Sequence, residues 1–136
     1  MDADTKRNVT AWLPVICYCV LLFIQSSFAS PKSLPTFSGM DKLLHFGAYG
    51  FLGLLFLRAF SISSSRLETP RIMFYSFLLT AAYGISDEVH QSFVITRTAE
   101  AMDVIADVLG GGFGIFLYYI TNRSVYAAER HHNRRQ

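Results

Sequence analysis

The segment MDVIADVLGGGFGIFLYYIT, residues 102–121, is apolar apart from two acids near its beginning. A helix needs about 20 mostly apolar residues to cross the hydrocarbon of a membrane, so the segment predicts a membrane-spanning helix. Its acids, Asp103 and Asp107, share one helical face with Glu100, at the spacing i, i+3, i+7. Because a carboxylate that faces lipid is costly, we expect this face to turn toward the interior of a bundle.

Glycines continue the same face toward the end of the segment. Gly110 and Gly114 are separated by three residues, a pattern that allows two membrane helices to approach closely. We interpret it as packing of this helix against another helix of the same chain. Contact between two copies of the chain, in a homo-oligomer, is the alternative.

The composition of the whole chain agrees with a membrane environment. Of 136 residues, 51% are hydrophobic and 16% are charged, where globular proteins average about 25% charged residues. The mean hydropathy is +0.31. A net charge of +2 and 15% aromatic residues exclude a disordered chain and give no basic surface for nucleic acid. Cys17 and Cys19 are too few for a disulfide scaffold, and we interpret them as small buried hydrophobes.

Three further apolar stretches, and the loops between them, complete the predicted fold. The loops are rich in serine and proline, as in SPKSLPTFSG at 30–39 and SISSSRLETP at 61–70. The prediction is an all-α fold, an integral membrane four-helix transmembrane bundle over residues 10–121, between an N-terminal tail (1–9) and a basic C-terminal tail (122–136). The predicted spans are 10–29, 43–60, 72–91 and 102–121.

The distribution of basic residues predicts the orientation of the bundle. Nine lysines and arginines lie at the end that carries both termini, and three lie at the other end. Because cytoplasmic loops are enriched in these residues, we expect both termini in the cytoplasm and the chain in the inner or plasma membrane. The nine are Lys6, Arg7, Arg58, Arg66, Arg71, Arg123, Arg130, Arg134 and Arg135; the three are Lys32, Lys42 and Arg97.

A cleaved signal peptide is a second interpretation of the first span. Lys6 and Arg7 precede the apolar stretch, and Ser27-Phe28-Ala29 follows it as a small-x-small cleavage pattern. The stretch is longer than the apolar region of about 7–15 residues that is usual in signal peptides. This length favours an uncleaved membrane anchor.

Most other ionisable residues gather at the outer ends of the second, third and fourth spans. Asp107 lies beyond the first turn of its helix, where the helix dipole no longer stabilises an acid, so we expect a partner inside the bundle. The expected partners are Lys42, His45 and Arg97, whereas Asp41 is expected to cap the second span. The set comprises Asp41, Lys42, His45, Asp87, Glu88, His90, Gln91, Arg97, Glu100, Asp103 and Asp107.

Motifs in these stretches resemble those of the VanZ-like membrane proteins. They are DKLLHF at 41–46, followed by Tyr49 and Gly50, and DEVHQSF at 87–93, followed by Arg97 and by DVIADVLG at 103–110. The resemblance covers residues 10–121 and implies a small membrane protein of a family with mostly unknown activity. The family is named for a member linked to low-level resistance to the glycopeptide antibiotic teicoplanin, a phenotype that the resemblance alone does not assign to this chain. Asp107 stands where many members have asparagine.

The first hypothesis for the polar residues is an enzyme acting on a lipid-linked phosphate or glycan. Carboxylate oxygens and a histidine nitrogen suit a divalent metal ion, and a carboxylate or histidine can act as general base or acid. Lysine and arginine suit a phosphate group. The expected catalytic residues are His45, Glu88 and Asp103, the expected metal ligands are His45, Glu88, Asp103 and Asp107, and the expected substrate-binding residues are Lys42, Tyr49, Gln91 and Arg97.

Two non-enzymatic hypotheses stay open beside it. In one, the residues line an outward-facing pocket that binds a membrane lipid, a cell-wall precursor or an amphiphilic drug by its head group. In the other, Lys42 and Arg97 pair with the carboxylates and only lock the helices together. No nucleophile elbow or HExxH motif selects a reaction.

Overall fold

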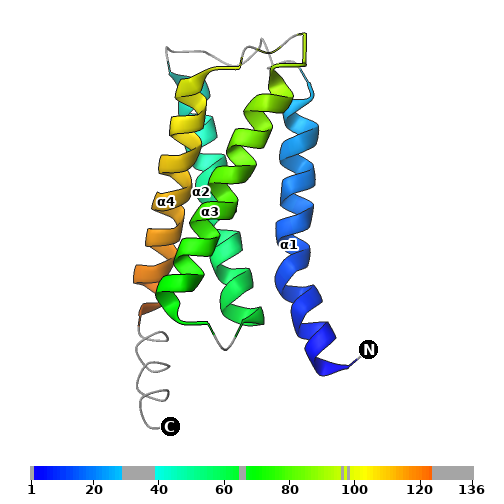
Figure 1. The fold of residues 1–136 in the computed structure, drawn as a ribbon, viewed down its shortest axis with the longest axis vertical. Helices are drawn as coiled ribbons and strands as arrows, with labels where there is room; N and C mark the ends of the chain where they lie inside the picture. Colours follow the sequence, from blue (N-terminus) through cyan, green and yellow to red (C-terminus); the bar gives the residue numbers. More distant parts are fainter. Residues whose placement is uncertain (1, 29–38, 65–66, 96, 98, 124–136) are drawn as a thin grey trace.

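The described part of the chain folds into four helices (Figure 1). The computed structural model describes residues 2–28, 39–64, 67–95, 97 and 99–123, and within these ranges the chain forms no strand. The all-α prediction is therefore confirmed. The predicted loop at 30–39 and the basic tail lie almost entirely outside these ranges. The helices are α1 (Ala3–Ser26), α2 (Met40–Ser63), α3 (Thr69–Gln91) and α4 (Ala101–Thr121).

Three of these helices, α1, α2 and α4, are long and apolar enough to cross a membrane. The third helix, α3, has a similar length of 23 residues but a more polar sequence. Arg71 lies near its beginning, and Asp87, Glu88 and His90 lie near its end. Membrane insertion therefore does not account for the polar residues at the end of α3, and these residues need another explanation.

The helices extend beyond several of the predicted spans, because polar residues near the membrane surface remain helical. The helix α1 begins seven residues earlier than predicted, where Asp2 accepts a hydrogen bond of 2.8 Å from the Thr5 amide. The expected capping role of Asp41 is wrong. Gly39, with a φ of 95°, is the N-cap of α2, and Asp41 lies in the first turn. Glycine suits this position because other residues rarely adopt a positive φ.

Glycines bring α2 and α4 into direct backbone contact. A Cβ atom at Gly114 would overlap the carbonyl oxygen of Gly50, and one at Gly110 would overlap that of Phe46. Both glycines are buried. The interpretation of the Gly-x-x-x-Gly pattern as packing within one chain is thus confirmed, and the contact fixes the spacing of the two helices that begin at the polar end.

The helix α1 packs alongside α2 and reaches α3 (Figure 1). Trp12 donates a hydrogen bond of 3.1 Å from Nε1 to Ser63 Oγ, and the Tyr18 hydroxyl donates one of 3.1 Å to the carbonyl of Ala48. These bonds connect α1 to the last residue of α2 and to its first half. The expected burial of both cysteines is wrong for Cys17, which is exposed.

The outer surface of the bundle is apolar. On α4 one helical face is exposed and carries large hydrophobic side chains, whereas the opposite face carries the acids and glycines. A surface of this composition suits contact with the lipid of a membrane. The exposed residues of this face are Met102, Ile105, Leu109, Phe113 and Phe116.

Candidate functional site

Polar residues gather where α2 and α4 begin and α3 ends, at the end of the bundle opposite the beginning of α1 (Figure 1). Four carboxylates at this end expose at most 7% of their surface: Asp87, Glu88, Asp103 and Asp107. Buried charged groups are normally paired, or they coordinate a metal. The partners of these four acids therefore indicate what the site can do.

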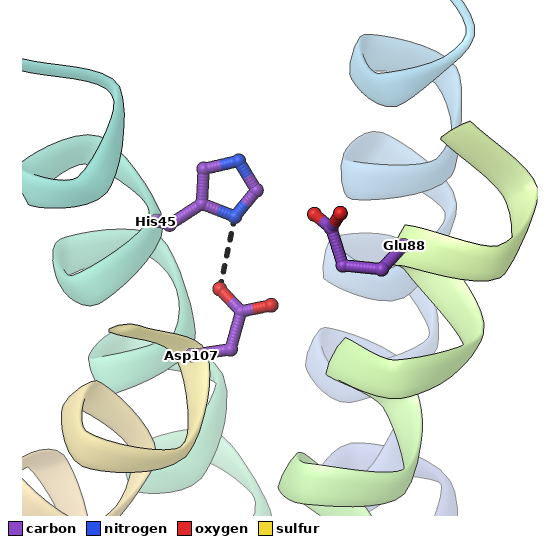
Figure 2. Close-up of side chains that lie close together, drawn as sticks. All are labelled: His45, Glu88 and Asp107. Carbon is purple, nitrogen blue, oxygen red and sulfur yellow. Dashed lines mark hydrogen bonds and ion pairs between the residues drawn. The ribbon is translucent and has the colours of Figure 1, made fainter. Parts of the chain in front are cut away.

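His45 and Asp107 form the innermost polar pair. His45 Nδ1 lies 2.9 Å from Asp107 Oδ1 in a hydrogen bond (Figure 2), and Asp107 is completely buried. The two residues lie about 8 and 9 Å along the helix axes from the beginnings of α2 and α4. When Asp107 is ionised, Nδ1 donates the proton, and in a neutral imidazole the second nitrogen, Nε2, is then left as an acceptor. Of the three expected partners of Asp107, His45 makes this contact.

Gly84 of α3 makes room for the Asp107 side chain. A Cβ atom at position 84 would lie 2.9 Å from both Cβ and Oδ2 of Asp107, closer than side chains pack. The sequence analysis did not single out Gly84. Its position in the sequence could have indicated this role. Gly84 lies one helical turn before Glu88 on the same face of α3, where a missing side chain permits close approach of another helix.

Glu88 faces the pair of His45 and Asp107 from the third helix. Its Oε2 accepts a hydrogen bond of 3.0 Å from the backbone amide of Glu100 at the start of α4. Figure 2 shows its carboxylate turned toward the imidazole of His45 and the carboxylate of Asp107. Within the described ranges, Glu88 Oε1 and Asp107 Oδ2 are buried and have no hydrogen-bond partner. Three helices thus bring polar side chains together, and two of these side chains, from α3 and α4, carry unsatisfied oxygens.

Asp103 belongs to a separate group around Lys42. The Lys42 Nζ lies 2.7 Å from Asp41 Oδ2, 2.7 Å from Glu100 Oε2 and 3.3 Å from Asp103 Oδ1. Because the ammonium lies among these three carboxylates, it partly neutralises them. The structure therefore places Asp103, which was expected beside His45, Glu88 and Asp107, in an ion-pair network that is more exposed to solvent.

The other expected substrate-binding residues have different surroundings. Tyr49 is buried, and its ring is stacked parallel to that of His45 with centroids 6.2 Å apart. Gln91 Nε2 donates a hydrogen bond of 3.0 Å to Asp87 Oδ2, which partly satisfies this fourth buried acid. Arg97 donates to the carbonyl oxygens of Phe28 and Gln25, at 2.9 and 3.1 Å. Its guanidinium therefore holds the segment before α4 against the end of α1.

His90 also lies apart from the cluster, although the sequence analysis placed it near the other polar residues. Its Nε2 lies 2.9 Å from Ser27 Oγ, and its ring packs on Phe23 with centroids 4.5 Å apart. Both partners are residues at the end of α1. His90 therefore connects α3 to α1, and His45 is the histidine of the cluster.

The cluster of His45, Glu88 and Asp107 combines one nitrogen donor with two carboxylates in a buried setting. These groups can hold a cation, accept hydrogen bonds from a hydroxyl or amine, or move a proton between a carboxylate and an imidazole. Burial strengthens each of these interactions, because the surroundings are less polar than water.

These features define a class of protein: a small all-helical membrane protein with a buried cluster of acids and a histidine at one end of its bundle. The chain belongs to the VanZ/LLP1 family, whose sequence profile it matches over residues 11–122. It is also similar to the "Uncharacterized protein C11E3.10" of Schizosaccharomyces pombe, with 29% identity over 100 residues. This match covers 74% of the chain and 59% of the relative, so the chain spans less than two thirds of that protein's length. No solved structure matches the chain.

Proposed function

We propose that this VanZ/LLP1 protein binds, at the polar end of its bundle, the head group of a membrane amphiphile. Membrane lipids, lipid-linked phosphates or glycans that serve as cell-wall precursors, and glycopeptide-type amphiphiles share the required chemistry. The supporting observation is two buried carboxylate oxygens, Glu88 Oε1 and Asp107 Oδ2, that have no hydrogen-bond partner in the described part of the chain. Leaving such acceptors unsatisfied is costly, and a hydroxyl or amine of a head group would satisfy them.

The surroundings of the cluster support an amphiphilic ligand. Leu43 and Leu44, the two residues before His45, are exposed on α2, and Ile105 is exposed on the face of α4 opposite Asp107. A ligand with its head group at the cluster could therefore leave its acyl chain on the apolar surface of the bundle.

The Glu88→Gln variant tests this proposal. Glutamine keeps an oxygen that can accept the Glu100 amide but removes the charge, so we expect the variant to fold with an unchanged or raised melting temperature. Native mass spectrometry of protein purified in mild detergent should show a lipid class on the wild type and about tenfold less of it on the variant. Lipid extracts from cells with and without the protein would reveal a change in mass if the bound lipid is also converted.

The control is Glu68→Gln, the same substitution at an exposed carboxylate at the beginning of α3. It should retain the bound lipid. Equal lipid on the wild type and on a stable Glu88→Gln variant would contradict the head-group proposal.

A structural role is the second candidate, and the contacts of Lys42 and Arg97 favour it for those two residues. Lys42 connects the beginnings of α2 and α4, and Arg97 holds α1, so both act as links between segments. If Glu88 also had only this role, the Glu88→Gln variant would lose melting temperature and cellular abundance together with any phenotype. The same experiment therefore separates the two candidates.

We further propose that all four helices cross the plasma membrane with both termini in the cytoplasm, as the excess of lysine and arginine at that end suggests. In a background of Cys17→Ala and Cys19→Ala, the Ala99→Cys variant should react with a membrane-impermeant maleimide on intact cells. The Ala3→Cys variant should react only after permeabilisation. Both alanines are exposed, so accessibility within the protein does not bias the comparison. Labelling of Ala3→Cys on sealed cells would reverse the proposed orientation.

A further inference from the structure

We propose that His45, Glu88 and Asp107 form a binding site for a single divalent transition-metal ion, with Zn²⁺ as the best fit. One ligand atom from each of the three residues can be chosen such that all three atoms lie within 4.8 Å of one another. The residues come from α2, α3 and α4, so the site exists only in the folded bundle. The inference concerns the cluster assigned above to a head group, but it rests on the geometry and burial of the three residues and not on the proposed head-group binding.

The spacing of the donors fits a common ion. His45 Nδ1 and Asp107 Oδ1 are 2.9 Å apart. At the tetrahedral angle that Zn²⁺ favours, two ligands bonded at about 2.1 Å to one metal lie about 3.4 Å apart, so the two donors would move apart by about 0.5 Å when the ion replaces the hydrogen bond between them. The carboxylate of Glu88 approaches the same pair from the opposite helix (Figure 2), so a small change of its side-chain torsions would complete a three-residue set.

The unsatisfied oxygens are the independent observation that points to a ligand. Asp107 is 0% exposed and Glu88 is 6% exposed, yet within the described ranges Asp107 Oδ2 and Glu88 Oε1 have no hydrogen-bond partner. Two buried carboxylates that face each other repel when both are ionised. A divalent cation bound between the two carboxylates would remove this repulsion and would also satisfy their unpaired oxygens.

The donor set selects the class of metal. Mg²⁺ and Ca²⁺ favour oxygen ligands only, whereas imidazole nitrogen suits Zn²⁺ and its neighbours in the first transition row. Among sites of mixed nitrogen and oxygen ligands, Zn²⁺ binds more tightly than Mn²⁺. Three protein ligands also leave a coordination position open, where a water or an oxygen of a head group can bind.

The second group of acids carries no such inference. Asp41, Glu100 and Asp103 also bring oxygens within 4.8 Å of one another. The Lys42 ammonium already lies 2.7 Å from two of these carboxylates and 3.3 Å from the third. A metal there would have to displace a cation that makes three contacts.

Zinc binding by the 136-residue chain, purified without a histidine tag and stripped with a chelator, tests the site. We expect elemental analysis after dialysis against Zn²⁺ to find one ion per chain, and added Zn²⁺ to raise the melting temperature. Asp107→Asn, Glu88→Gln and His45→Gln should each weaken Zn²⁺ binding by at least about tenfold. Asp4→Asn, Glu68→Gln and Asp41→Asn should bind as the wild type does, and so should a His131→Gln/His132→Gln variant of the C-terminal tail.

Two results would overturn the metal site. One is a wild-type protein that takes up no stoichiometric Zn²⁺, and the other is undiminished binding by the three site variants. Glu88→Gln serves as the decisive variant if Asp107→Asn or His45→Gln fails to elute as a monodisperse helical protein. Lipid content measured in the same samples keeps the two proposals apart. Lipid without Zn²⁺ refutes the metal site alone, and Zn²⁺ without lipid refutes head-group binding alone.

Discussion

Alanine at position 114 is expected to prevent stable packing of the bundle, lowering the free energy of unfolding by about 3 kcal/mol or more. The added Cβ would overlap the backbone carbonyl oxygen of Gly50, which no side-chain rotation can move aside. This overlap is relieved only if α2 and α4 move apart along the contact that also includes Gly110. The gain in helix propensity, at most about 1 kcal/mol, is too small to offset this. Thermal unfolding in detergent, followed by circular dichroism, measures the loss.

The matched control is Gly112→Ala on the same helix. A Cβ at this position would meet Phe77 Cε2 at 3.6 Å, which is ordinary van der Waals contact. Alanine there should leave stability unchanged or raise it by about 0.5–1 kcal/mol, because glycine in a helix interior is unfavourable. Equal stability of the Gly114→Ala and Gly112→Ala variants would show that α2 and α4 do not meet through their backbones at Gly114.

The His45→Leu variant should lose about 3 kcal/mol of stability, the second large effect. It leaves the completely buried Asp107 without the imidazole that lies 2.9 Å from its Oδ1. A buried carboxylate without a partner is far more costly than a neutral amide. The double variant His45→Leu/Asp107→Asn should therefore recover most of the loss, and a double-mutant cycle by thermal unfolding measures the coupling. Simple addition of the two single effects would show that the pair contributes nothing.

The helices were predictable from the sequence because membrane crossing imposes a length and a composition. The predicted ends of the third and fourth spans, Gln91 and Thr121, coincide with the ends of α3 and α4. The beginnings were less accurate at α1, where the apolar pattern starts at Thr10 but the helix already starts at Ala3. An apolar pattern reports the part of a helix in contact with lipid, and a helix can continue into the polar surroundings.

The gathering of polar residues at one end could also be predicted, but their pairing could not. Helical spacing gives the face on which Asp107 lies, whereas the rotation of α4 against α3 decides which partner it meets. That rotation depends on Gly84, whose missing side chain lets the carboxylate approach α3. Arg97 shows a second limit. It donates to the backbone carbonyl oxygens of Gln25 in α1 and of Phe28 just after this helix. Every residue carries such an acceptor, so no sequence pattern identifies the partner.

The glycine contact between α2 and α4 has a consequence for selectivity. It lies directly below His45 and Asp107, since Phe46 and Gly110 meet within one helical turn of that pair. Backbone atoms in direct contact cannot adapt as long side chains do, so the spacing of the two backbones that carry His45 and Asp107 is fixed before any ligand arrives. Little conformational entropy is then lost on binding. For the proposed metal site, this fixed backbone spacing predicts that ions too large to be reached by both His45 and Asp107 bind only if the two helices separate.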